Sequence, residues 1–477
     1  MKPVRLLKLS AVVLSVGLQP CITMSALADD HLDPGLSVIS PTKLQPNPGN
    51  TARVPAAPRT VSASEQRLGL EQAIRVAVDW HPSIAEAVGT LLQQGENINV
   101  AKAGYYPQVT GGIKGGYDSG YDGDRNTQAV SISLKQMLYD FGKVDSSVDA
   151  ARAKAAQSQA NILLAIDQVA RDTAYAYIEV QRYQHLLATA RDQIKGIGDI
   201  VELAQQRSDM GASTRSDVVQ AQSRADGGMA TLQDYKAQYA RWQSTLANLL
   251  GRRSVPQVTD AFATALEQSC QAPDNGDALP AVLAAVAQCT QAQAELANAK
   301  AQAYPTLSLE PSLNQYLDND YNKDNPDINR TQVGIFLNLE VPIYQGGAIS
   351  ARSRAAGHAL TAADSAEDAA RLQARQGLTE AQSQTAGLGR RLDALKTREA
   401  SISQARELYG KQYLELGTRP LLDLLNAEQE IYQSRFDLEN TVADSRRLQI
   451  DCLYNSGGLR RAFGIDHSTI QHVEILP

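Results

Sequence analysis

The chain carries two kinds of hydrophobic pattern. From Leu68 onward, most of it consists of long stretches rich in Ala, Gln, Arg, Asp and Leu with few prolines, which is typical of long helices and coiled coils. Four shorter runs alternate apolar and polar residues with a period of two, and this predicts strands with one apolar face. These runs cover residues 109–117, 130–138, 307–313 and 333–341.

The same pattern occurs twice along the chain. The segment 101–107 recurs at 299–305, and Gly211 and Asp217 recur as Gly417 and Asp423. Each half places a helix before a pair of strands, and a pair of very long helices after it. Segments rich in Asp, Asn and Gly separate the paired strands, as expected for hairpin loops. Such self-similarity indicates two structural repeats.

We therefore expect two repeats with matching elements. The first helix runs from Leu70 to about Gly104, and its counterpart covers about 279–303. The first repeat covers 68–251 and contains a β-hairpin at 106–139 and a long helical hairpin at 143–251. A linker at 252–278 leads to the second repeat at 279–456, which contains a β-hairpin at 305–344 and a long helical hairpin at 348–456. A C-terminal tail covers 457–477.

The N-terminal region has the features of an export signal. Lys2, Arg5 and Lys8 precede an apolar run, and a small-x-small cleavage site ends at Ala28. We expect a signal peptide over 1–28 and a Pro-rich extended arm over 29–67. Loss of the signal's three positive charges would change the formal charge from -7 to -10 (-7 minus 3). A chain this acidic is a poor nucleic-acid binder.

Three cysteines lie beyond the predicted signal peptide. An oxidising compartment permits a disulfide, and we expect Cys270 to pair with Cys289, because the two are close in sequence and flank a Pro/Asp/Asn/Gly segment. Two buried thiols are the alternative. Cys452 would then be unpaired.

The four predicted strands suit a membrane better than a soluble sheet packed on helices. No apolar run beyond the signal reaches 18 residues, so any crossing would use strands closed into a barrel. The strands are about 10 residues long, and aromatic residues cluster at their ends, as in membrane-barrel girdles. Two copies would give eight strands, three would give 12 and four would give 16. The expected interface aromatics are Tyr105, Tyr106, Tyr117, Tyr139, Phe141, Tyr304, Tyr316 and Tyr344.

Over residues 68–465 the sequence resembles the TolC-type outer-membrane efflux family. The resemblance rests on segments 70–74, 106–107 and 304–305, 138–142 and 343–347, and above all on Gly417-Thr-Arg-Pro-Leu-Leu-Asp-Leu-Leu-Asn426. It implies a mainly α fold with a β-barrel sector. Long antiparallel helical hairpins would form a periplasmic tunnel, and four strands per protomer would enter a shared 12-stranded barrel. It also implies a homotrimer in outer-membrane lipid that docks onto an inner-membrane pump through a periplasmic adaptor.

The resemblance also assigns a gate to the second helical turn. Asp423 matches the first aspartate of a family pair that rings the constriction, and Asn426 departs from the second. A ring of carboxylates would favour cations. Arg419 matches a basic residue that locks the closed tip, with Ser216 and Asp217 as its expected counterparts. The family has a tyrosine at the position that Leu414 occupies here, and the adjacent Tyr413 would substitute for it. Alternatively, Asp217 and Asp423 simply stabilise helix N-termini.

The sequence gives no sign of an enzyme or of a cofactor. The histidines are scattered, and no metal-ligand spacing, nucleophile elbow or Gly-rich phosphate loop is present. A periplasmic coiled-coil adaptor is a rival, but two helical hairpins plus two strand pairs argue against it. We expect an exit duct for type I secretion of a large protein such as an adhesin, with an inner-membrane ABC exporter. Multidrug efflux with a drug pump is the alternative.

Overall fold

The computed structural model describes residues 67–117, 126–262, 264–271, 276–317, 329–466, 469–471 and 473–474. The expected signal peptide lies outside the described residues, as does the expected arm up to residue 66. Most of both expected hairpin loops, 118–125 and 318–328, lies outside them as well.

Two helices precede the first strand pair where the sequence predicted one. Helix α1 covers Leu70–Trp80, and α2 covers Pro82–Lys102. The break falls at His81, because Pro82 has no backbone N–H to continue α1 but fits the first position of a new helix. His81 caps α2, with Nδ1 accepting a hydrogen bond from the Ser83 backbone N–H. A short 3₁₀ turn, Ala103–Tyr105, leads to the first strand.

The four strands form one antiparallel sheet in chain order. They are β1 (Gln108–Tyr117), β2 (Asn126–Tyr139), β3 (Thr306–Tyr316) and β4 (Thr331–Glu340). The register places Ile113 opposite Val130, and Leu309 opposite Leu337. Since neighbours in register share a face, the predicted apolar residues of all four strands lie on one side. The other side carries mainly Ser, Thr, Asn, Gln, Lys and Glu.

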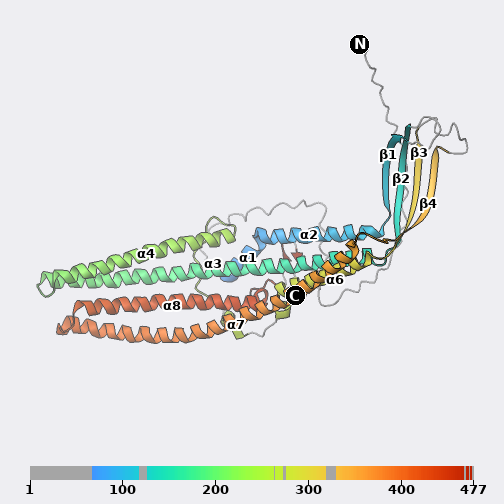
Figure 1. The fold of residues 1–477 in the computed structure, drawn as a ribbon. Coiled ribbons are helices and arrows are strands. Elements are labelled where there is room, and N and C mark those ends of the chain that lie inside the picture. The colour runs from blue at the N-terminus through green and yellow to red at the C-terminus, as the bar shows by residue number, and fades with distance from the viewer. Residues whose placement is uncertain are drawn as a thin grey trace, which may run out of the picture. The chain divides into compact units, whose positions relative to one another are not determined.

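Two long helical hairpins follow the strand pairs (Figure 1). Helix α3 covers Lys143–Asp209 and α4 covers Arg215–Leu249, while α7 covers Ala348–Lys411 and α8 covers Leu421–Asn455. Helix α3 has 67 residues, about 100 Å at 1.5 Å per residue. It packs against α4, α8 and α6 (Pro280–Ala301). In the described part of the chain, no helix is both long and apolar enough to cross a membrane.

Short elements connect the repeats and end the chain. They are α5 (Thr264–Glu267), the 3₁₀ turns Ser269–Gln271 and Gly276–Ala278, α9 (Leu459–Ala462), β5 (Thr469–Ile470) and β6 (Val473–Glu474). Leu68 bridges Val258 in parallel, and the Tyr177 hydroxyl bonds the Leu68 carbonyl at 3.1 Å. The largest core cluster lies here and joins α1, the middle of α3, the linker and the end of α8.

The predicted Cys270–Cys289 disulfide is wrong. Cys270 is bonded to Cys452, 182 residues later in the chain, and Cys289 is a buried free thiol. The linker folds across α8, so that the Ser269 hydroxyl donates to the Gln449 carbonyl at 2.9 Å. Cys289 instead lies on α6 and donates to Asp364 of α7 at 2.9 Å, which raises the pKa of the thiol to about 11. Closeness in sequence misled because tertiary packing decides which sulfurs meet.

Candidate gate at the two helical turns

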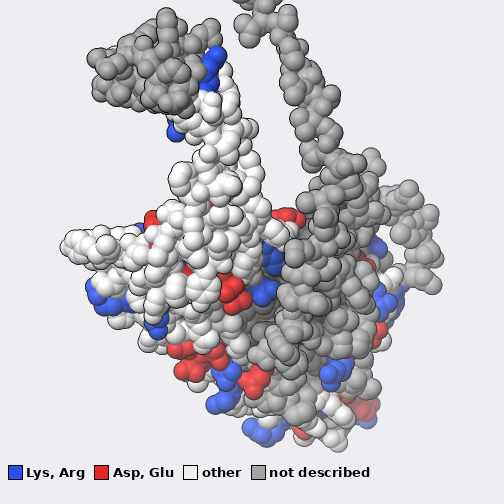
Figure 2. Space-filling model, turned by 90° about the vertical axis from the view of Figure 1, so that its right-hand side faces the viewer, with Lys and Arg blue, Asp and Glu red and all other residues white. Residues whose placement is uncertain are grey.

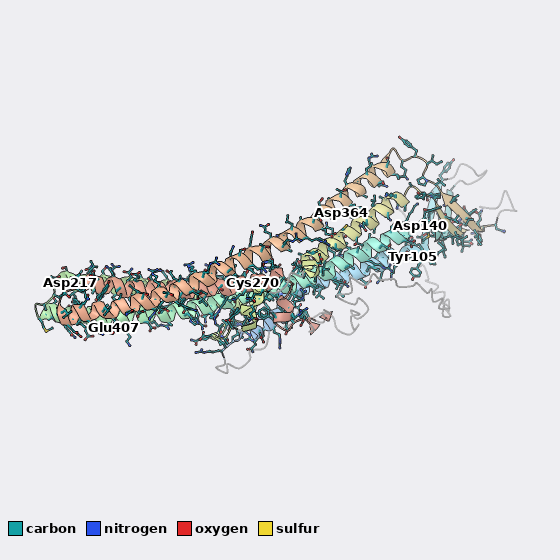
Figure 3. The ribbon with its side chains drawn as sticks, turned by 90° about the horizontal axis from the view of Figure 1, so that it is seen from below. Tyr105, Asp140, Asp217, Cys270, Asp364 and Glu407 are labelled. Atoms are coloured by element: carbon teal, nitrogen blue, oxygen red, sulfur yellow. A yellow bond between two sulfur atoms is a disulfide. The ribbon has the colours of Figure 1, made fainter. Side chains whose placement is uncertain are left out.

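The turns that end the two helical hairpins pack together through one small apolar cluster. The cluster combines α3, α4, the π-helical turn after α7, and α8, and it consists of Ile200, Ala204, Ala221, Tyr413, Leu421, Leu424 and Leu425. In Figure 3, Asp217 on α4 and Glu407 on α7 mark this end of the hairpins, and Cys270 lies far from it. The predicted gate residues are therefore brought to one end of the molecule.

In the turn between α3 and α4, hydrogen bonds at the N-terminus of α4 fix the position of Asp217. Thr214 caps α4 and accepts from the Asp217 backbone N–H, and the Asp217 carboxylate accepts from the Thr214 backbone N–H in return. The Ser213 hydroxyl donates to the same carboxylate at 2.7 Å. These hydrogen bonds hold the pKa of Asp217 below its usual value, with the Ser213 bond contributing most. Ser216 shares a hydrogen bond with the Thr214 hydroxyl.

In the second turn, the equivalent aspartate is engaged by an arginine. Arg419 donates to the Asp423 carboxylate at 2.8 Å and to Gln412 at 2.9 Å. Its guanidinium lies 4.3 Å from the centre of the Tyr409 ring. Pro420 occupies the N-cap of α8 and supplies no side-chain cap, so the carboxylate is free to bind the arginine. The hydrogen bond that Arg419 donates to the Asp423 carboxylate raises the pKa of Arg419 above its usual value.

Tyr413 joins the second turn to α3. It lies in a single π-helical turn, Gln412–Leu416, and is 5 % exposed. The Arg207 guanidinium lies 4.6 Å from the centre of the Tyr413 ring and donates to the Tyr413 carbonyl at 3.3 Å. Within the described part of the chain the Tyr413 hydroxyl has no hydrogen-bond partner. Tyr413 is therefore a packing contact between the two hairpins, through its ring and its carbonyl.

Asn426, where the sequence departs from the family pair, contacts α4. Arg224 donates to the Asn426 side-chain oxygen at 3.4 Å and also bonds Gln429. Sequence reasoning did not single out Arg224. It follows Asp217 and Ala221 at positions i+7 and i+3 on the same helix, so helical periodicity could have placed it on the same face.

Among the described residues, the hydrogen bonds of the Arg419 side chain stay within the second turn and do not reach Ser216 or Asp217. Within the described residues, its polar side-chain partners are Asp423 and Gln412. The predicted lock between Arg419 and the first turn therefore stays a prediction, and it would require a second copy of the chain.

Helices α7 and α8 are fastened along their length by arginine–glutamate pairs. Arg406 bonds the buried Glu428 at 2.7 Å, and Arg435 bonds Glu399 at 2.8 Å. These pairs hold the two helices of the α7–α8 hairpin to each other. Its contacts with α3 and α4 at the tip are the Arg224 and Arg207 contacts described above and the apolar cluster.

The predicted interface aromatics fall at the two ends of the sheet. At the helix end, Phe141 stacks on Tyr304 with ring centres 5.4 Å apart and meets Tyr139 edge-on at 4.7 Å. Tyr106 and Tyr344 are exposed at the same end, and Tyr105 bonds Asp145. Tyr117 and Tyr316 lie at the opposite end, opposite Asn126 and Ala129 respectively. Two separate aromatic levels are thus present.

The described residues contain no group of His, Cys, Asp and Glu that could hold a metal ion.

A family model described as outer membrane efflux protein matches residues 73–252 and 278–449. The chain belongs to the outer membrane efflux protein family. It is therefore an outer-membrane efflux channel protein that extends into the periplasm, and it is not an enzyme.

Several known proteins resemble the chain over most of its length. The outer membrane efflux protein BepC of Brucella suis is 28% identical over 361 residues, which cover 71% of this chain and 74% of BepC. The outer membrane protein TolC of Vibrio cholerae is 24% identical over 82% of this chain and 91% of TolC. The crystal structure of VceC from Vibrio cholerae aligns with a TM-score of 0.71 at 20% identity and covers 82% of this chain and 96% of VceC. The predicted fold class of helical hairpins plus four strands is confirmed.

Proposed function

We propose that three copies of this chain assemble into one channel-tunnel, which is the exit duct of a tripartite export system. The observation that carries this proposal is the sheet. In the described part of the chain, strands β1 and β4 each pair with one other strand, so both edges of this sheet can pair with another chain. One face exposes Val109, Ile113 and Ile335, which suits lipid. Three such sheets joined edge to edge would form the smallest closed barrel, at 12 strands, that leaves a passage.

Crosslinking tests the assembly. Cysteines introduced on the outer edges of β1 and β4, in protein solubilised from outer membranes, should give a three-chain ladder that stops at three. A ladder that stops at two, or a soluble periplasmic pool of monomer, would contradict the proposal. Cysteines in the central strands β2 and β3 are the matched control and should not crosslink neighbouring copies.

We propose that Asp423 and Arg419 form the gate at the tip. Asp423 would present a ring of three carboxylates, and Arg419 would restrain the α7–α8 turn through Gln412 and Tyr409. In planar lipid bilayers, Arg419→Ala should raise single-channel conductance, and Asp423→Asn should lower cation selectivity. Glu407→Gln removes one negative charge, as Asp423→Asn does, but on α7 outside the gate, and it is the control for that variant. The gate assignment is wrong if both variants conduct and select as the unmodified channel does.

The tip also offers a surface for the periplasmic adaptor. Met210, Val219 and Leu416 are 74%, 62% and 67% exposed, and apolar side chains this exposed at one end favour protein docking. We infer that the adaptor's helical tip packs here. Met210→Lys should abolish crosslinking to the adaptor while leaving the amount of trimer unchanged.

For the cargo, we propose type I secretion of a large protein such as an adhesin, with small-molecule efflux as the second candidate. The match to TolC of Vibrio cholerae, which covers 91% of that protein, supports a TolC-type tip. The name of the relative BepC, an efflux protein, favours the second candidate. A deletion strain separates the two. Loss of one large secreted protein at unchanged drug susceptibility supports secretion, and increased drug susceptibility with an unchanged set of secreted proteins supports efflux.

A further inference from the structure

The four long helices lie side by side in the order α4, α3, α8, α7 (Figure 1). Helix α3 has a neighbour on either side and is buried at most positions from Val169 to Gln181. Helix α7 lies at one edge of this layer and α4 lies at the other. Of the 64 residues of α7, the buried ones are Ala363, Leu378, Ala381 and Leu395. In the described part of the chain, α4 and α7 are thus the two open edges of the helical layer.

The internal repeat indicates which helices cover the open side of α7. Helix α3 of the first repeat packs against α6 and α8, which both belong to the second repeat. The equivalent partners of α7 are α2 and α4 of the first repeat, but within this chain α7 packs on α6 and α8. A second copy can supply both missing helices, because a closed symmetric assembly brings one edge of each chain to the other edge of the next. Helix α2 leads into β1 and α7 follows β4, so joining these two strands in a barrel also brings α2 and α7 of neighbouring copies together.

Two pairs of glycines fix which residues of the two repeats are equivalent. Gly142 and Gly347 precede α3 and α7 with φ angles of 84° and 81°. Gly251 and Gly457 follow α4 and α8 with φ angles of 64° and 74°. Positive φ favours glycine, so each pair marks one structural position. Counting from these glycines matches each residue of α3 to one of α7, and each residue of α8 to one of α4.

One arginine of α8 contacts α3 at mid-length within the chain. Arg447 reaches the Glu179 carboxylate at 3.4 Å, and its guanidinium lies 4.8 Å from the centre of the Tyr175 ring. Tyr175 and Glu179 are one helical turn apart and lie on the same side of α3. An arginine at the position of Arg447 therefore meets the residues at these two positions of the neighbouring long helix.

The equivalent positions on the two open edges carry opposite charges. Arg447 corresponds to Arg241 of α4, and Tyr175 corresponds to Glu380 of α7. Arg241 and Glu380 are both exposed. Glu380 accepts a hydrogen bond from Gln376, one turn earlier on the same helix, at 2.8 Å. Among the described residues neither Arg241 nor Glu380 has an ion-pair partner, so the two can meet when α4 of one copy packs on α7 of the next.

The end of α2 shows the same relation with an apolar side chain. Within the chain, the Asn298 side chain of α6 donates to the Lys143 carbonyl at the start of α3 at 2.7 Å. Counted from the first residues of α6 and α2, Asn298 corresponds to Val100. Val100 is 71% exposed, and Lys143 corresponds to Ala348 at the start of α7. Contact between Val100 and the start of a second copy's α7 would remove this apolar side chain from water.

We propose that α7 of one copy packs against α2 and α4 of the next copy, in a seam in which Arg241 forms an ion pair with Glu380. This inference rests on the proposed trimer and specifies the contact that joins its copies outside the barrel. The model for the pair is the contact between Arg447 and Glu179, in which the Glu179 side chain is 4% exposed. A pair enclosed in this way contributes more to specific assembly than a solvent-exposed one, because losing one partner leaves the other charge buried and unpaired.

Charge reversal in the full-length protein, solubilised from outer membranes, tests the seam. Arg241→Glu and Glu380→Arg each place like charges opposite each other, and each should lower the temperature at which the trimer dissociates by several degrees. The double variant restores opposite charges and should recover at least half of that loss. Asp393→Arg on another side of α7 and Lys236→Glu on another side of α4 reverse exposed charges in the same way. These two controls should leave the dissociation temperature unchanged.

The outcome for the double variant decides the proposal. Recovery supports the ion pair, because two unrelated structural effects would add instead of cancelling. Losses that add, or no change in any variant, overturn the seam.

Crosslinking gives a second measurement if a charge reversal prevents assembly. Arg241→Cys with Glu380→Cys, in a Cys289→Ser background, should be joined between copies by a short bismaleimide into a ladder that stops at three. Either cysteine alone should give no ladder. A ladder from cysteines on β1 and β4 without one from this pair overturns the seam and leaves the trimer standing. Failure of both ladders counts against the trimer itself.

Discussion

The long helices are joined by one set of contacts at mid-length and by a different set at the tip. At mid-length, Asp167 of α3 is 3% exposed and bonds Arg460 of α9 at 2.5 Å. The buried Glu179 lies within 3.4 Å of both Arg182 and Arg447. The disulfide between Cys270 and Cys452 ties the linker to α8 in the same region, and Figure 3 labels Cys270 there.

At the tip, the polar contacts are part-buried or exposed. The side chains of Arg419 and Asp423 are 38% and 34% exposed, and the bond between Arg224 and Asn426 is exposed as well. Exposed ion pairs contribute about 0–1 kcal/mol, whereas removing one partner of a buried pair costs several. The mid-section therefore fixes the two repeats to each other. Separating the α7–α8 hairpin from α3 and α4 requires the least free energy at the tip.

The charged surface follows the same division. In Figure 2, Lys, Arg, Asp and Glu gather over the helical region, and the described part of the strand region is largely uncharged.

Removing Arg460 should have the largest effect. Arg460→Ala leaves Asp167 buried without its partner, and we expect the free energy of unfolding to fall by about 3–5 kcal/mol. Burial raises the pKa of Asp167 to about 6, although Arg460 opposes this. A raised pKa means that the stability Asp167 contributes is present below about pH 4 and lost as the pH rises through about 6. The loss in Arg460→Ala should therefore be larger at pH 8 than at pH 5.

Thermal unfolding followed by circular dichroism at the two pH values checks this. Arg461→Ala, a neighbouring exposed arginine on α9, is the control and should change little. An equal loss at both pH values would show that Asp167 does not titrate in this range.

Breaking the disulfide should have the second largest effect. Cys270→Ser with Cys452→Ser removes a crosslink that closes a long loop, and we expect a loss of about 2–4 kcal/mol. Reduction of the unmodified protein should give a similar decrease in the thermal midpoint. Cys289→Ser leaves the crosslink intact and should not reproduce it. If the double variant keeps the midpoint, the mid-section does not depend on this bond.

The first turn should respond more weakly. Thr214→Ala removes the cap of α4 and should cost about 1 kcal/mol. Because the pKa of Asp217 is lowered, its contribution is present above the usual aspartate value near 4 and lost as the pH falls through its lower folded pKa. Amide hydrogen exchange in α4 should therefore increase in Thr214→Ala, and the difference from the unmodified protein should shrink in acid.

The smallest effect on stability should come from the second turn. Arg419→Ala removes an exposed ion pair and should change the free energy of unfolding by less than about 1 kcal/mol, although we expect it to raise conductance. The change in the free energy of unfolding in Arg419→Ala, divided by the change in Arg460→Ala, measures the difference between the tip and the mid-section. A loss at Arg419 as large as that at Arg460 would abolish the distinction between a fixed mid-section and a loosely held tip.

Much of the fold was readable in the sequence, and less of the site. Helix α3 spans Lys143–Asp209 as expected, because local periodicity decides helix and strand. The break at His81 was missed, although Pro82 is the signal for it. The sequence placed Asp217 and Asp423 at equivalent positions of two turns. Their different partners depend on Thr214 in one turn and Pro420 in the other, so the difference is visible in the sequence once the caps are compared.

The sequence by itself determined the repeat, the two-faced strands and the length of the helices, because these depend on residues a few positions apart. Only the tertiary structure decided which distant residues meet. It paired Cys270 with Cys452 instead of Cys289, and it brought Arg460 to Asp167. These contacts join segments far apart in sequence, whose closure is fixed by the packing of the whole chain and not by local preference.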